Sequence, residues 1–92
     1  MYNLQYSKKF KRDLKKYKKD SNFKIEDLNK ILWLLSKKKP LDERHRNHKL
    51  KDEFQGCMEC HIKSDLLLIY SIDDINKEID LYRLGSHSEL FG

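Results

Sequence analysis

The fold of this 92-residue chain follows from the stretch CMECHIKSDLLLIYSIDDINKEIDLYRL, residues 57–84. Apolar and polar residues alternate over 57–62 and again over 78–84, which is the pattern of strands with one buried face. Between them, residues 66–70 (LLLIY) form a continuous apolar run, typical of a central strand covered on both faces. Residues 73–76 (DDIN) are turn material. The stretch therefore predicts a three-stranded antiparallel meander.

The segment before this stretch predicts a strand followed by two helices. Residues 2–6 (YNLQY) alternate enough for a short strand, and Ser7 is a suitable N-cap for a helix. Apolar residues recur at helical spacing in two segments joined by a break at residues 20–22: Phe10, Leu14 and Tyr17 in the first, and Ile25, Leu28, Ile31, Leu32 and Leu35 in the second. Trp33, in the second helix, is expected to pack in the core. Together these elements predict one α+β domain over residues 1–92, with the two-helix hairpin on one face of the sheet.

The charge of the chain is unevenly distributed. Twenty Lys and Arg against fifteen Asp and Glu give a net charge of +5. Residues 1–40 hold thirteen of the basic and four of the acidic residues, a net charge of +9, so that residues 41–92 carry −4. Clustered cations indicate either contact with a polyanion such as nucleic acid or a lysine-rich solvent face. Because so short a chain rarely encloses a deep cavity, we expect function on an exposed face or shallow groove.

The pentapeptide CMECH, residues 57–61, allows two metal-based interpretations. C-x-x-C-H is the attachment signature of c-type haem, and Cys57 and Cys60 with two histidines could form a zinc site. The motif falls inside an alternating strand, which would send the two cysteines to opposite faces, and the chain has no hydrophobic export signal or apolar span. We therefore expect a cytoplasmic protein without metal, cofactor or membrane partner, in which Cys60 is a small core residue and Cys57 a surface one.

The four histidines lie around the meander rather than at random. His45 and His48 precede it, His61 lies in its first strand and His87 follows its last. Because strand ends and loops meet along one edge of a small sheet, five side chains are expected to converge there: Glu59, His61, Asp65, Arg83 and His87. Imidazole, carboxylate and guanidinium groups can supply the base, the acid and the cation that RNA cleavage without a metal requires.

Three segments resemble the YafQ branch of the RelE/ParE superfamily of bacterial toxin–antitoxin toxins. They are HKLKDEFQG at 48–56, ECHIKSDLLLIY at 59–70 and YRLGSHSELFG at 82–92. The resemblance implies a RelE-like fold and an endoribonuclease that cuts mRNA, typically on the ribosome, and is silenced by a bound acidic antitoxin. A non-catalytic binder on the same fold, either a gyrase inhibitor or an RNA-binding module, is the alternative.

The resemblance also implies roles for individual residues. His87 matches the key catalytic histidine, a candidate general acid. His48 and His61 match histidines implicated in proton transfer and substrate binding, and Asp65 matches a catalytic-site aspartate. Arg83 matches an arginine expected to steady the scissile phosphate.

Four more residues complete the predicted site. Glu59 stands where the family commonly has Asp, so the carboxylate is kept but moved by one methylene. Phe91 either docks on the core or stacks on a base of the substrate. Lys49 and Lys51 are expected to bind the RNA substrate.

Overall fold

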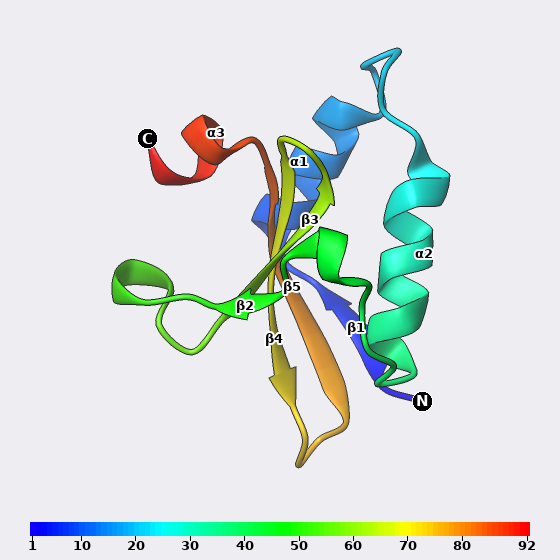
Figure 1. Cartoon of the computed structure of the whole chain (residues 1–92), viewed down its shortest axis with the longest axis vertical. Helices are drawn as coiled ribbons and strands as arrows, with labels where there is room; N and C mark the ends of the chain where they lie inside the picture. Colours follow the sequence, from blue (N-terminus) through cyan, green and yellow to red (C-terminus); the bar gives the residue numbers. More distant parts are fainter.

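A computed structural model describes the whole chain, Met1–Gly92. Three helices and five strands occur along it, with two short 3-10 helices in the central part (Figure 1). Their bounds are, in order, β1 (Asn3–Tyr6), α1 (Lys8–Tyr17), α2 (Ile25–Ser36), η1 (Glu43–His45), β2 (His48–Lys49), η2 (Asp52–Phe54), β3 (Met58–Lys63), β4 (Leu66–Asp73), β5 (Glu78–Gly85) and α3 (His87–Phe91).

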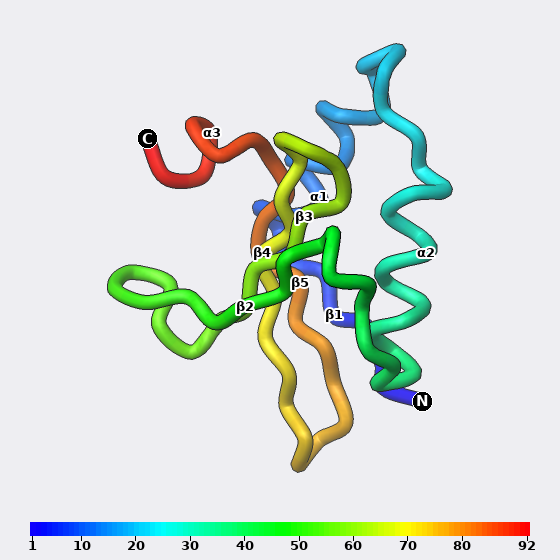
Figure 2. The backbone as a smooth tube through the Cα atoms, in the orientation of Figure 1, coloured from blue at the N-terminus to red at the C-terminus, as the bar shows by residue number.

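The strands form one sheet in the order β1-β5-β4-β3-β2. The antiparallel meander β3-β4-β5 is present as the sequence predicts, and the path of the chain through it can be followed in Figure 2. The N-terminal strand β1 pairs in parallel with β5, with Leu4 opposite Ile79. The two-residue strand β2, which the sequence did not predict, adds to the far edge by pairing with β3.

Helices α1 and α2 cover one face of the sheet, as predicted. The Ser7 side chain accepts a hydrogen bond from the backbone N–H of Phe10 and so caps α1. Phe10 is fully buried against apolar residues of α2, β3, β4 and β5. This main core contains thirteen buried residues: Phe10, Leu28, Ile31, Leu32, Leu35, Cys60, Ile62, Leu66, Leu68, Tyr70, Ile79, Leu81 and Leu84.

The prediction that Trp33 packs in the core is wrong. Its side chain is 51% exposed. Successive residues of a helix are separated by about 100° around its axis, and the buried stripe of α2 is already formed by Leu28, Ile31, Leu32 and Leu35. Position 33 therefore faces outward.

The opposite face of the sheet carries a second, smaller core. Helix α3 brings Leu90 onto Leu67 and Ile69 of β4, and four partly buried residues surround them: Leu50, Phe54, Cys57 and Phe91. The sequence did not predict α3, so the helices occupy both faces rather than one. This second face is where the predicted site lies.

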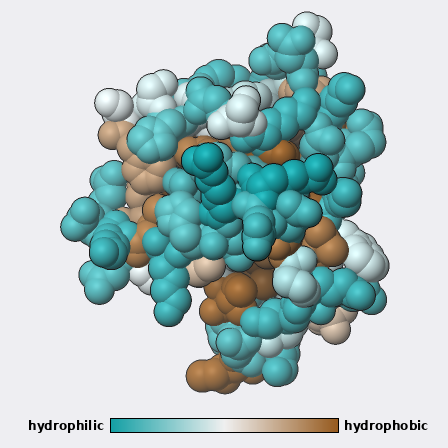
Figure 3. Space-filling view, viewed as in Figure 1, coloured by the Kyte–Doolittle hydropathy of each residue, from teal (hydrophilic) through white to brown (hydrophobic).

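The surface seen in Figure 3 is mostly hydrophilic, with apolar atoms also at the lower tip, where the β4–β5 hairpin ends. Ile75 in that turn is 91% exposed. No helix combines the length and the apolar character needed to cross a bilayer.

Candidate active site

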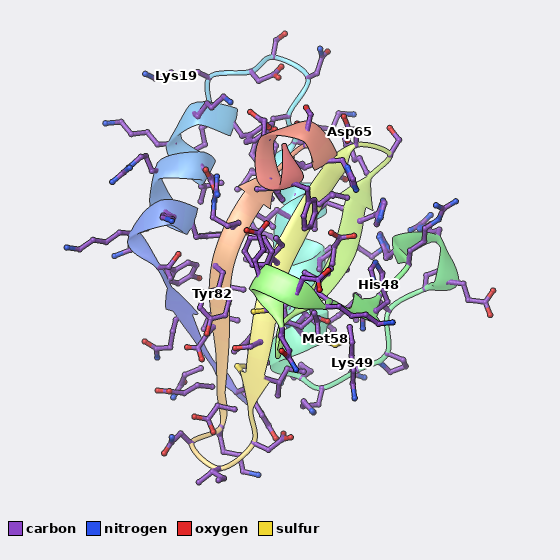
Figure 4. The ribbon with its side chains drawn as sticks, turned by 90° about the vertical axis from the view of Figure 1, so that its left-hand side faces the viewer. Lys19, His48, Lys49, Met58, Asp65 and Tyr82 are labelled. Carbon is purple, nitrogen blue, oxygen red and sulfur yellow. The ribbon has the colours of Figure 1, made fainter.

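The strand register places three of the predicted site residues in one row across the sheet. His48 of β2 lies opposite Glu59 of β3. Glu59 lies opposite Ile69 of β4, and Ile69 lies opposite Arg83 of β5. Since register partners share a face of the sheet, the row lies on the α3 side, away from α1 and α2. Figure 4 looks onto this face.

The Glu59 carboxylate lies close to the rings of two histidines. Its Oε1 lies 3.1 Å from Nε2 of His48 and 3.7 Å from Nε2 of His61. The Glu59 side chain is only 6% exposed, whereas that of His48 is 49% exposed. Nδ1 of His48 lies 3.1 Å from the backbone oxygen of Lys49, so both ring nitrogens face oxygen atoms. A buried carboxylate between two imidazoles is suited to proton transfer.

The Arg83 side chain is held by Asp13 of α1, a residue that the sequence analysis did not single out. Its Nε donates to Oδ2 of Asp13 over 2.8 Å, and its Nη2 donates to Oδ1 over 3.3 Å. The same Oδ2 accepts the backbone N–H of Leu84. These hydrogen bonds raise the pKa of Arg83 and leave Nη1 free of protein partners. The only available signal in the sequence was that Asp13 is the single acidic residue of the lysine-rich helix α1.

Helix α3 carries His87 and Phe91 and is anchored at its first turn. Ser86 and Glu89 form a capping box, in which each side chain accepts a hydrogen bond from the backbone N–H of the other residue. Asp65, in the β3–β4 turn, accepts the backbone N–H of His87 over 3.0 Å. The Asp65 carboxylate thus holds the main chain at His87 rather than touching a histidine ring.

Glu89 also ties α3 to α1. Its carboxylate accepts hydrogen bonds from the Lys16 ammonium and the Tyr17 hydroxyl. Lys16, the backbone N–H of Ser86 and Tyr17 together lower the pKa of Glu89 to about 2. Burial and the hydrogen bond to Glu89 raise the pKa of Tyr17, which therefore remains a neutral donor.

The structure shows one of the two roles left open for Phe91, which is docking on the core. Its ring meets Phe54 edge-on at 5.6 Å and lies 4.9 Å from the exposed ring of His87, tilted by 41°. Phe91 therefore docks on the second core and also flanks the His87 imidazole. A partly exposed aromatic ring of this kind is a suitable platform for a nucleobase.

The predicted site residues form three groups rather than one contact cluster. The first group is His48, Glu59 and His61, the second is Arg83 with Asp13, and the third is His87 and Phe91 with Asp65 beneath the helix start. No hydrogen bond or ion pair joins one group to another. The buried side chains of Leu67 and Ile69 lie between them on β4.

The two lysines expected to bind substrate are exposed and lie at the border of this face. Lys49 of β2 lies opposite Met58 of β3, and the Met58 side chain packs against the main core. The register position of Lys49 therefore belongs to the main-core face of the sheet, opposite to the face of His48 (Figure 4). Lys51 precedes η2 and makes no ion pair.

The cysteines are not arranged as a metal site. Cys60 belongs to the main core and Cys57 packs against the second core on the other face, which rules out joint coordination by the C-x-x-C pair. Burial raises the pKa of the Cys60 thiol to about 12. Across the chain, no three His, Cys, Asp or Glu side chains are grouped as metal ligands.

Comparison with known proteins gives a consistent result. Residues 2–92 match the family described as "Bacterial toxin of type II toxin-antitoxin system, YafQ". The chain is 32% identical over 95 residues to the mRNA interferase toxin YafQ of Escherichia coli K12, covering 99% of this chain and 92% of that protein. It is 37% identical over 90 residues to a putative toxin YafQ of Haemophilus influenzae, covering 94% and 88%.

Solved structures are similar over the whole chain. A metal-bound toxin from Helicobacter pylori superposes with a TM-score of 0.92 at 42% identity, covering 99% of this chain and 100% of that one. The E. coli DinJ–YafQ complex contains a chain that superposes with a TM-score of 0.87 at 29% identity, covering 100% of both.

Proposed function

Because this chain belongs to the YafQ family of bacterial type II toxin–antitoxin toxins, we propose that it is an endoribonuclease that cleaves mRNA. The observation that carries the proposal is the face of the sheet shared by three groups. A carboxylate bridges two histidines, an arginine is held with one nitrogen free, and a short helix presents an exposed histidine. These are the acid, base and cation that the reaction needs.

The reaction proposed is attack of the RNA 2′-hydroxyl on the adjacent phosphorus. The new bond forms a 2′,3′-cyclic phosphate, and the bond to the 5′-oxygen of the next nucleotide breaks. A base must take the 2′-hydroxyl proton and an acid must give a proton to the leaving 5′-oxygen. Glu59 with His48 and His61 supplies proton-accepting and proton-donating groups, and His87 supplies a second exposed imidazole.

Arg83 stabilises the charge that develops on the phosphorane. Asp13 holds the guanidinium side-on, so Nη1 is available to a phosphate oxygen without a change of rotamer. Phe91, stacked beside His87, places the base next to the reacting phosphate. Metal is not needed for any of these steps.

The basic half of the chain supports an RNA substrate and a ribosomal setting. Six of the ten residues of α1 are Lys or Arg, and their outward face attracts phosphate groups at long range. A toxin of this charge is silenced by an acidic antitoxin in the cytoplasm, and a structurally similar toxin is known in complex with DinJ.

The test is expression of the wild type and of His87→Ala, followed by growth measurements and mapping of mRNA 5′ ends. We expect the variant to lose toxicity and to cleave at least about 100-fold more slowly, since a general acid or base contributes roughly that much. Ser88→Ala, also exposed on α3, is the matched control and should remain active.

Equal cleavage by wild type and His87→Ala would refute the role of His87. Retention of RNA by the wild type without cleavage, with or without ribosomes, would refute the nuclease and support a binding module.

A further inference from the structure

A second concave region lies at the edge of β3 beyond the short strand β2. It is a cavity of about 540 Å³ between α2, the segment around η1 and the end of β3. We call it the basic edge pocket, and its polar lining consists chiefly of Asp27, Lys30, Arg44, Arg46, His61 and Lys63.

Basic side chains outnumber acidic ones in the lining of this pocket. Asp27 is its only acidic lining residue, and it pairs with Lys63 over 3.2 Å. The side chains of Lys30, Arg44 and Arg46 are exposed and make no hydrogen bond or ion pair within the chain. Only two of the ten lining residues are hydrophobic, so the pocket suits phosphate groups better than the apolar anchors of a protein segment.

The pocket and the candidate active site share one residue, His61. His61 is among the residues that line the pocket, and its ring Nε2 lies 3.7 Å from Glu59 Oε1. The buried ring of His45 connects the η1 segment to β3 at the pocket, because its Nδ1 donates a hydrogen bond to the backbone oxygen of His61 over 2.6 Å. A strand of RNA that passes the Glu59 group can therefore continue directly into the basic edge pocket.

We propose that the basic edge pocket binds backbone phosphates of the same RNA strand, outside the cleaved bond. The proposal rests on RNA being the substrate, as in the proposed function, but it concerns binding and requires no catalysis. Lys30, Arg44 and Arg46 pair with the phosphates, and His61 forms the border between the two sites.

The experiment measures binding of a short single-stranded 2′-O-methyl RNA, which cannot be cleaved because its 2′-oxygen is blocked. Fluorescence anisotropy gives the affinity at several salt concentrations for the wild type and for the double variant Lys30→Gln/Arg44→Gln. The matched control Lys37→Gln/Lys39→Gln removes two exposed lysines just beyond the C-terminal end of α2, about two turns from Lys30.

We expect the pocket variant to bind about tenfold more weakly. Its plot of log affinity against log salt should be shallower by about 1.4, since each phosphate contact on a single strand contributes about 0.7. The control should stay within about twofold of the wild type. With a cleavable RNA, the pocket variant should raise KM and leave kcat unchanged, because the pocket does not touch the reacting bond.

Three results would overturn the proposal. One is unchanged RNA affinity in the pocket variant, and another is an equal loss in the control, which would mean diffuse attraction without a site. The third is unchanged RNA affinity with weakened binding of an acidic antitoxin, which would assign the pocket to a protein partner. A wild type that binds the blocked RNA through the pocket but cleaves nothing would refute only the nuclease.

Discussion

Replacement of Glu89 by Gln tests whether the position of α3 depends on its hydrogen bonds to α1. The Glu89 carboxylate accepts hydrogen bonds from Lys16, from Tyr17 and from the backbone of Ser86. Gln keeps the length and one acceptor oxygen but loses the negative charge. We expect α3 to loosen and His87, at its first position, to lose its alignment.

The size of the effect follows from the pKa of Glu89. A fall from 4.5 to about 2 corresponds to at most about 3 kcal/mol of folding free energy. The side chains are 32% exposed at Glu89 and 67% exposed at Lys16, so solvent screening reduces this value. We expect a loss of about 1–2 kcal/mol, or about 4–16 °C in Tm for a domain of this size.

The dependence on pH gives a second, independent readout. The folded-state pKa of Glu89 is lowered, so its contribution to stability is complete above about pH 4.5 and is lost as the pH falls through about 2. Gln does not titrate. The difference in unfolding free energy between wild type and variant should therefore be constant near neutral pH and shrink between about pH 4.5 and 2.

Urea unfolding followed by circular dichroism measures the stability, and cleavage of a model RNA measures kcat and KM. Glu43→Gln, an exposed carboxylate in η1 without a side-chain partner, is the control for net charge. We expect Glu89→Gln to lower kcat about tenfold with little change in RNA affinity. If the variant has wild-type Tm and kcat, or if the stability difference does not depend on pH, the tie does not hold α3 in place.

Two further substitutions probe the support of the site. Asp13→Asn should lower kcat about tenfold with RNA affinity nearly unchanged, because Arg83 loses its charged partner; kinetics equal to the wild type would count against this. Gly85→Ala should destabilise the fold by about 1–2 kcal/mol and reduce cleavage, because its Cβ would lie 3.1 Å from Glu89 Oε1 and 3.2 Å from Leu90 Cδ2, and these two side chains of α3 would have to move by a few tenths of an ångström. Thermal melting and the cleavage assay measure both effects, and an unchanged Tm would show that α3 accommodates the methyl group.

The arrangement of supports explains how a shallow site can be rigid in a small domain. Arg83 is oriented by Asp13, which lies 70 residues earlier in the chain. His87 is fixed through its backbone by Asp65 and through its helix by Glu89. Arg83 and the first turn of α3 are therefore each held by residues of other elements, and the second core beneath α3 keeps these elements together.

The sequence by itself determined the elements whose signal is local and long enough to read. Alternation over 57–62 and 78–84, the apolar run at 66–70 and the helical spacing before them were sufficient for the meander and for the two-helix hairpin. The resemblance to the YafQ toxins came from residues 48–56, 59–70 and 82–92, since motif residues such as His87 and Arg83 keep a fixed spacing along the chain.

Only the tertiary structure decided the short elements and the contacts between distant residues. A two-residue strand such as β2 and a five-residue helix such as α3 are not stable alone, because so few hydrogen bonds do not offset the entropy of ordering them; they form where the β3 edge and the second core support them. The exposure of Trp33 and the pairing of Asp13 with Arg83 depend in the same way on which surfaces meet. Local periodicity indicates that a residue is helical, but packing between distant segments decides what its side chain touches.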